Sequence, residues 1–127
     1  MKTFEMNGLL WQVIDVPEDS PFLIDRTGRR TVATTDGKTL CVYVSDSVSG
    51  DFRKRVIAHE MGHATCFSYG LLDEIRRCCY PSKRIEMEEF ICNFVADHGE
   101  MIFEITYSLL GDDALRMLPK YLERLVA

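Results

Sequence analysis

The chain has 127 residues, of which 46% are hydrophobic and 28% are charged. This balance is typical of globular proteins and excludes global disorder, and the length predicts a single domain over residues 1–127. The formal net charge of −5 argues against nucleic acid as a direct partner, because phosphate binding needs a basic face.

Cysteine usage and apolar runs bear on the compartment. Residues 1–5 are charged and lack the apolar segment of a secretion signal. No run in the chain approaches the ~18 apolar residues needed to span a bilayer. None of the five cysteines stands in a C-x-x-C pair, so we expect reduced thiols rather than disulfides or a cysteine metal site. The sequence therefore predicts a cytoplasmic protein with no membrane partner.

The first 45 residues favour β-strands. Residues 9–16 are rich in β-branched and aromatic side chains and stop before Pro17, and a second strand is expected at 22–24. Residues 31–35 and 39–45 flank Asp36-Gly37, a pair that favours a tight hairpin. These segments predict a small twisted sheet of three or four strands.

After residue 49 the apolar residues recur at helical spacing. A first helix is expected from Ser49 or Asp51 to about Gly70, a short one over 71–79, and a long one over 83–110 that ends at Gly111. A last amphipathic helix would begin at residue 112 or 113 and place Leu115, Leu118, Leu122 and Leu125 on one side. The predicted fold class is α+β, with the sheet first and the helices after it.

Residues 59–63 read His-Glu-Met-Gly-His. On a helix, His59 and His63 lie one turn apart on the same face, so that both rings can reach one Zn²⁺ ion. Glu60 lies between them and can act as the base for a water molecule at an open metal position. Gly62 is a poor helix former, which indicates that another segment packs closely there. With three histidines in the chain, this pattern arises by chance about once in 300 random sequences, although an exposed helix face without a metal remains the alternative.

A catalytic zinc site needs a third protein ligand. Glu89 and Asn93 have the most suitable spacing, because they lie one helical turn apart. Glu89 could bind the metal, and the Asn93 side chain could orient the ring of His59 or His63. The helical wheel favours Glu88 instead, since it places Glu88 in the apolar arc, where a buried carboxylate needs a partner. The downstream candidates are Glu86, Glu88, Glu89, Asp97 and His98.

The two motifs together resemble one family of proteins. H-E-x-G-H at 59–63, followed by E-x-x-C-N-x-x-A at 89–96, is similar to the ImmA/IrrE family of metallopeptidases, which pairs an H-E-x-G-H helix with a later E-x-x-A-N-x-F-A helix. Cys92 stands where that family has Ala, and Val95 stands where it has Phe. The resemblance implies a zincin-like fold in which His59, His63 and Glu89 bind Zn²⁺ and Glu60 is the catalytic base.

The resemblance also implies a substrate. The family cleaves regulatory proteins, often helix-turn-helix repressors of phages and mobile elements, so we expect a zinc metallopeptidase that hydrolyses peptide bonds in such a protein. The substrate would lie extended along the strand at 39–45. The main alternative is a non-catalytic, metal-stabilised binding module that grips a repressor or toxin. A scaffold that needs no metal is a third reading.

Overall fold

The computed structural model describes residues 2–115. The chain forms two compact units, Met1–Asp97 and His98–Ala127. The sheet, both predicted motifs and every residue of the candidate site lie in the first unit. The single domain expected over residues 1–127 stays a prediction. Among the helices that the structure describes, none is both long enough and apolar enough to cross a membrane.

The first unit begins with a four-stranded mixed sheet, ordered β1-β2-β4-β3. The central pair, β2 and β4, is parallel, whereas β1 pairs with β2 and β3 pairs with β4 in the antiparallel sense. The sheet therefore has β3 at one edge and β1 at the other. The strands are β1 (Lys2–Met6), β2 (Leu9–Val16), β3 (Ala33–Asp36) and β4 (Cys41–Ser45).

The predicted sheet of three or four strands is confirmed, and three local details differ from expectation. The residues expected as a strand at 22–24 form a 3-10 helix over Pro21–Leu23, whose first turn suits the fixed φ of proline. The expected hairpin between β3 and β4 forms, but its turn runs over residues 37–40, so its second strand begins at residue 41 rather than 39, and Leu40 closes the turn at φ 56°. The strand β1 was not predicted; the turn at Asn7-Gly8, with φ 50° and 77°, joins it to β2.

The helices follow the sheet, so the α+β class is confirmed. The three are α1 (Gly50–Ser68), α2 (Leu71–Cys78) and α3 (Arg84–Leu110), and the last runs from the first unit into the second. All three helices begin and end within two residues of the predicted bounds. A 3-10 helix over Gly111–Leu115 follows α3. The rest of the predicted last helix lies outside the described residues.

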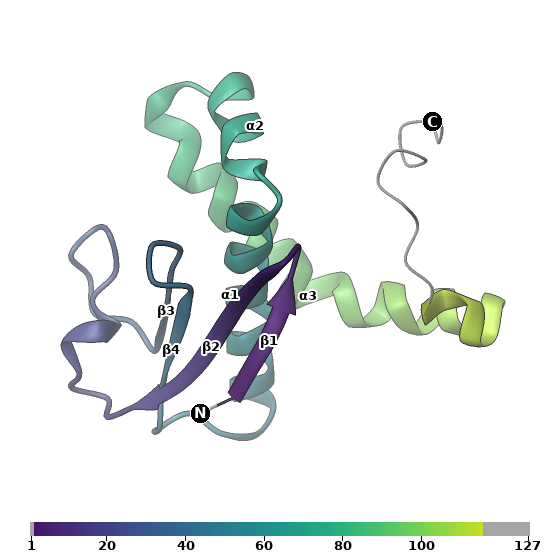
Figure 1. Cartoon of the computed structure of the whole chain (residues 1–127), viewed down its shortest axis with the longest axis horizontal. Coiled ribbons are helices and arrows are strands. Elements are labelled where there is room, and N and C mark those ends of the chain that lie inside the picture. The colour runs from purple at the N-terminus through teal and green to yellow at the C-terminus, as the bar shows by residue number, and fades with distance from the viewer. Residues whose placement is uncertain (1, 116–127) are drawn as a thin grey trace. The chain divides into compact units, whose positions relative to one another are not determined.

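The core forms where α1 packs against one face of the sheet (Figure 1). Trp11 of β2 is fully buried, and its indole N–H donates to Ser68 Oγ at 2.9 Å at the far end of α1. The Trp11 ring also meets Phe67 edge to face, with centroids 5.9 Å apart. These contacts fix the C-terminal end of α1 against the sheet. The buried residues of this core are Trp11, Ala33, Val42, Val44, Val48, Val56 and Ala64.

Gly37, in the turn between β3 and β4, allows this packing. A Cβ atom at Gly37 would lie 2.3 Å from the Phe67 ring. The glycine of the Asp36-Gly37 pair, which the sequence analysis interpreted only as a turn signal, therefore also allows the close approach of α1.

Candidate metal centre

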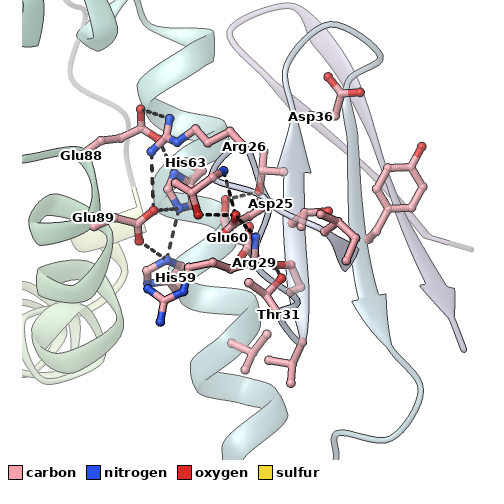
Figure 2. A pocket seen from close by; sticks show the side chains of 18 of the residues that line it. Asp25, Arg26, Arg29, Thr31, Asp36, His59, Glu60, His63, Glu88 and Glu89 are labelled. Carbon is pink, nitrogen blue, oxygen red and sulfur yellow. Dashed lines mark hydrogen bonds and ion pairs between the residues drawn. The ribbon is translucent and has the colours of Figure 1, made fainter. Parts of the chain in front are cut away.

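His59 and His63 lie one turn apart on α1 and point to the same place. Their Nε2 atoms are 3.1 Å apart, as the i, i+4 spacing predicts. Figure 2 shows both rings between α1 and α3, together with the carboxylates of Glu88 and Glu89. The first helix thus presents two imidazole nitrogens to the second.

Gly62 explains how α3 comes so close. A Cβ atom at this position would lie 2.9 Å from Cα of Cys92 and 3.0 Å from its Sγ. Such distances are well inside the ordinary contact of about 3.5–4.0 Å between carbon atoms. The glycine therefore lets the backbone of α3 approach α1 beside the two histidines.

Each histidine ring is held through its Nδ1 atom by a side chain of α3. His59 Nδ1 lies 2.9 Å from Asn93 Oδ1, and His63 Nδ1 lies 2.5 Å from Glu88 Oε2. Because both partners accept a hydrogen bond, Nδ1 carries the proton and Nε2 is left as the metal-facing atom. The sequence motif suggested this orienting role for Asn93, and the structure gives Glu88 the same role for the other ring.

Glu89 completes a triangle of donor atoms. Its Oε2 lies 3.1 Å from His59 Nε2, and its Oε1 lies 3.3 Å from His63 Nε2. Zinc bonds to histidine and carboxylate are about 2.0–2.2 Å long, so neighbouring ligands of a tetrahedral ion are about 3.3–3.5 Å apart. The three side chains therefore stand at separations close to those of a zinc ligand set, with Glu89 rather than Glu88 as the third.

The charges of the site agree with this arrangement. Hydrogen bonds from His59 and His63 hold the pKa of Glu89 well below its usual range, so the carboxylate is ionised. Burial alone lowers the pKa of His63, but its hydrogen bonds to Glu88 and Glu89 outweigh burial and raise it to about 10. Without a metal, the protonated His63 ring thus balances the negative charge of the neighbouring carboxylates. A bound cation would take over that role.

Cys92 is a second candidate for the third ligand. The ligand atoms of His59, His63 and Cys92 all lie within 4.8 Å of one another. Cys92 is fully buried, and contact with Cys66, together with burial, raises the pKa of its thiol. A thiol binds zinc as the thiolate, whereas Glu89 is already ionised, and its two oxygens lie 3.1 and 3.3 Å from the Nε2 atoms of His59 and His63. The site therefore offers two candidates for a third ligand, and Glu89 is the one already in the charged form that zinc requires.

Glu60 lies on the side of α1 that faces the sheet (Figure 2). It is almost fully buried, and its Oε2 accepts a hydrogen bond of 2.5 Å from the hydroxyl of Thr35 in β3. Burial raises the pKa of Glu60, and the Thr35 hydrogen bond partly offsets the rise. A carboxyl group with a raised pKa beside a metal position is suited to proton transfer near neutral pH.

Two residues of the site were missed by the sequence reasoning. Thr35 binds Glu60, and Arg26 binds both Glu88 and Glu89. Thr35 lies 25 residues before Glu60 in the sequence, and Arg26 lies 62 residues before Glu88. No local motif contains them, so only the fold brings them to the helices.

The remaining candidates from the sequence lie elsewhere. Glu86 is exposed and pairs with Lys83, 3.1 Å away, and Asp97 pairs with Arg55 of α1. His98 is the first residue of the second unit, outside the unit that holds the motif. The structure therefore brings His59, Glu60, His63, Glu88, Glu89 and Asn93 together, whereas Glu86 and Asp97 pair with Lys83 and Arg55 instead.

The site opens into a cleft of about 990 Å³ lined by β3, the segment before it and the three helices. The metal-facing groups and Glu60 are all part of its lining. Comparison with known proteins finds no family model that matches the chain and no curated protein similar to it in sequence. The resemblance to the ImmA/IrrE family therefore stays a prediction that rests on the two motifs.

Proposed function

We propose that this protein is a zinc-dependent peptidase. The observation that carries the proposal is the convergence of His59 Nε2, His63 Nε2 and the Glu89 carboxylate. The two Nε2 atoms are 3.1 Å apart, and each lies 3.1 or 3.3 Å from one of the two Glu89 oxygens. The buried Glu60 lies beside them and is not one of the three. Three protein ligands, an open position and a separate base form the arrangement of catalytic rather than structural zinc sites.

The roles of the residues follow from their places. A zinc ion held by His59, His63 and Glu89 would polarise the scissile carbonyl and make water a stronger acid. Glu60 takes the proton from the attacking water and returns it to the leaving amine. Thr35 holds the Glu60 carboxylate in position through its 2.5 Å hydrogen bond.

A polypeptide in extended conformation suits the cleft. The expectation that a substrate pairs with the strand at 39–45 is wrong, because β4 lies between β2 and β3. The free edge beside the site belongs to β3. Ser45 N–H donates to Val32 O, so the alternation of an antiparallel pair turns the backbone N–H and C=O of Thr35 outward. A substrate strand could pair there, next to the side chain that holds Glu60.

The cleft also favours apolar substrate side chains. Several large apolar residues of the first unit are exposed and gather along its walls instead of being scattered over the surface. They are Phe22, Ile24, Val32, Phe52, Phe67 and Ile85. We therefore infer a protein substrate with apolar residues near the cleaved bond, such as an unfolded segment of a repressor. The five free cysteines are consistent with the further proposal of a cytoplasmic location.

The test compares the zinc-loaded wild type with Glu60→Gln, which keeps the size of the side chain but removes the base. Each protein is incubated with a cell lysate, and new protein N-termini are identified by mass spectrometry. The wild type should generate new N-termini that a chelator suppresses, while Glu60→Gln should bind zinc equally well and lose about 10²–10⁴ in rate. Glu86→Gln, which changes an exposed glutamate of α3, should cleave like the wild type.

Ligand assignment is tested on the same proteins by zinc titration. Glu89→Gln should weaken zinc binding by orders of magnitude, and His59→Ala or His63→Ala should abolish stoichiometric binding. A wild type that binds no zinc at neutral pH would refute the proposal at its base.

A metal-stabilised binding module is the second candidate, and the closeness of Cys92 to both histidines favours it. A Cys92 thiolate added to the other three ligands would close the fourth position, as in structural zinc sites. Cys92→Ala separates the two functions. Unchanged zinc affinity supports the open, catalytic site, whereas a loss of 100-fold or more, with no cleavage by the wild type, supports the binding module.

A further inference from the structure

Arg26 is presented to the metal centre by a turn that its neighbours hold in place. Asp25 Oδ1 accepts hydrogen bonds from Thr27 N, Thr27 Oγ1 and Arg29 N, at 2.8, 2.6 and 3.0 Å. Asp25 N–H also donates to Arg29 O across the turn, and Gly28 supplies the left-handed residue at φ 83°. Arg26 is therefore carried by an ordered loop, and its side chain extends over the cleft toward α3 (Figure 2).

The guanidinium group of Arg26 contacts both acidic residues of the metal centre. Its NH1 lies 3.0 Å from Glu88 Oε1, and its NH2 lies 3.5 Å from Glu89 Oε1. Because His63 Nδ1 occupies the other oxygen of Glu88 at 2.5 Å, both carboxylate oxygens of Glu88 are engaged. Glu88 is also buried, with 7% of its surface exposed, so it has little freedom to reach another partner.

Two adjacent glutamates on one helix would otherwise compete for the same ion. Both carboxylates contact a histidine ring of the proposed metal centre. The difference between them lies in their partners. Glu88 bridges Arg26 and the back of the His63 ring, while Glu89 faces the Nε2 atoms of both histidines.

We propose that Arg26 is a positioning residue of the metal centre: it anchors Glu88 behind His63 and thereby leaves Glu89 as the third ligand. The inference rests on the proposed metal site and extends it to a residue that no motif contains. Arginine suits this task because its planar group offers several donors and keeps its charge at every physiological pH. Without Arg26, Glu88 loses one of its two anchors, the His63 ring is less restrained, and a second carboxylate becomes available to the ion.

The test measures metal binding and needs no substrate. Zinc affinity is determined by competition with a chromogenic chelator, and Co²⁺ is used as a spectroscopic replacement whose visible absorption reports the ligand set. The proteins are the wild type, Arg26→Ala, Glu88→Gln and the double variant. Arg29→Ala is the matched control, since it removes an exposed arginine from the same turn, three residues away.

We expect Arg26→Ala and Glu88→Gln each to weaken zinc binding about 10–100-fold, the range seen when partners of metal ligands are removed. The double variant should be no weaker than the weaker single variant, because both changes interrupt one chain of contacts. The cobalt spectrum of Arg26→Ala should differ from that of the wild type, and Arg29→Ala should match the wild type in both measurements. Arg26→Lys, which keeps the charge but not the two-point contact, should lie between.

Three results would overturn the inference. One is wild-type zinc affinity and an unchanged cobalt spectrum in Arg26→Ala; another is an equal loss in Arg29→Ala. A third is fully additive losses in the double variant, which would mean that Arg26 and Glu88 act separately. In all three the wild type still binds zinc, so the proposed function stands. Absence of zinc binding by the wild type would remove the proposed function and this inference together. The Arg26 side chain is 45% exposed and is not part of the hydrophobic core, so Arg26→Ala is expected to fold, and circular dichroism checks this.

Discussion

Gly62 of α1 faces the backbone of α3 at Cys92, and a Gly62→Ala substitution tests whether this contact sets the geometry of the metal centre. The added Cβ would lie 2.9 Å from Cα of Cys92. Carbon atoms in ordinary contact are about 3.5–4.0 Å apart, so α3 would have to move by about 0.6 Å or more. Protein ligands of a metal tolerate displacements of only about 0.2 Å. The shift therefore exceeds the tolerance of a site in which α3 contributes Glu89.

The effect on stability should be smaller than the effect on metal binding. Overpacking of a well-packed contact costs about 1–3 kcal/mol, but replacing glycine by alanine inside a helix returns about 1 kcal/mol. We expect a net loss of about 0–2 kcal/mol in the free energy of unfolding of the metal-free protein. Zinc affinity should fall at least about tenfold, because the displacement of α3 also moves the side chains that orient both histidines.

Urea denaturation in chelator measures the stability, and chelator competition measures zinc affinity, on the same preparation. The double variant Gly62→Ala/Cys92→Gly is the control. It removes the Cys92 atoms 3.0 and 3.1 Å from the new Cβ, so it should recover part of the lost affinity. If Gly62→Ala binds zinc as tightly as the wild type, the close contact of the two helices does not control the site, and our reasoning is wrong.

Three further perturbations test other parts of the structure. Zinc at 100 times its dissociation constant should stabilise the protein by about 2.7 kcal/mol and raise its Tm by roughly 10 °C or more, and a chelator should reverse the shift in calorimetry. Thr35→Val removes a hydrogen bond that lowers the pKa of Glu60, so the acidic limb of the pH–rate profile should move to higher pH. If the limb does not move, the ionisation of Glu60 does not control the rate. Trp11→Phe leaves the buried Ser68 hydroxyl without its 2.9 Å partner and opens a cavity, which should lower stability by about 2–3 kcal/mol in urea, partly restored by Ser68→Ala.

Local sequence patterns predicted the elements of this fold better than their arrangement. The strand β2 and the helices were visible because apolar periodicity and stop signals lie within a few residues of one another. Asn7-Gly8 was the available signal for β1, since this pair favours a hairpin turn. The parallel pairing of β2 with β4 was not visible, because it depends on contacts between residues about 29 positions apart.

The same division applies to the metal centre. The spacing of His59, Glu60 and His63 reflects the pitch of a single helix, so the sequence alone predicted that the two rings share a face. The choice between Glu88 and Glu89 depended on how α3 is rotated against α1, which the helical wheel could not decide. The wheel did predict that Glu88 is buried, but the buried carboxylate has Arg26 and His63 as partners rather than the metal position.

The proposed metal ligands lie on two different helices, so metal binding would be linked to folding. An isolated peptide containing α1 would supply only His59 and His63, and a free helix of 19 residues is marginal in water. Glu89 and both ring-orienting side chains come from α3, so the complete site exists only when the helices pack. A variant such as Trp11→Phe should therefore lose zinc only to the extent that it unfolds. Gly62→Ala should lose zinc affinity while still folded. Zinc affinity and folded fraction measured in both variants would therefore show whether affinity is lost because α3 has moved or because the chain has unfolded.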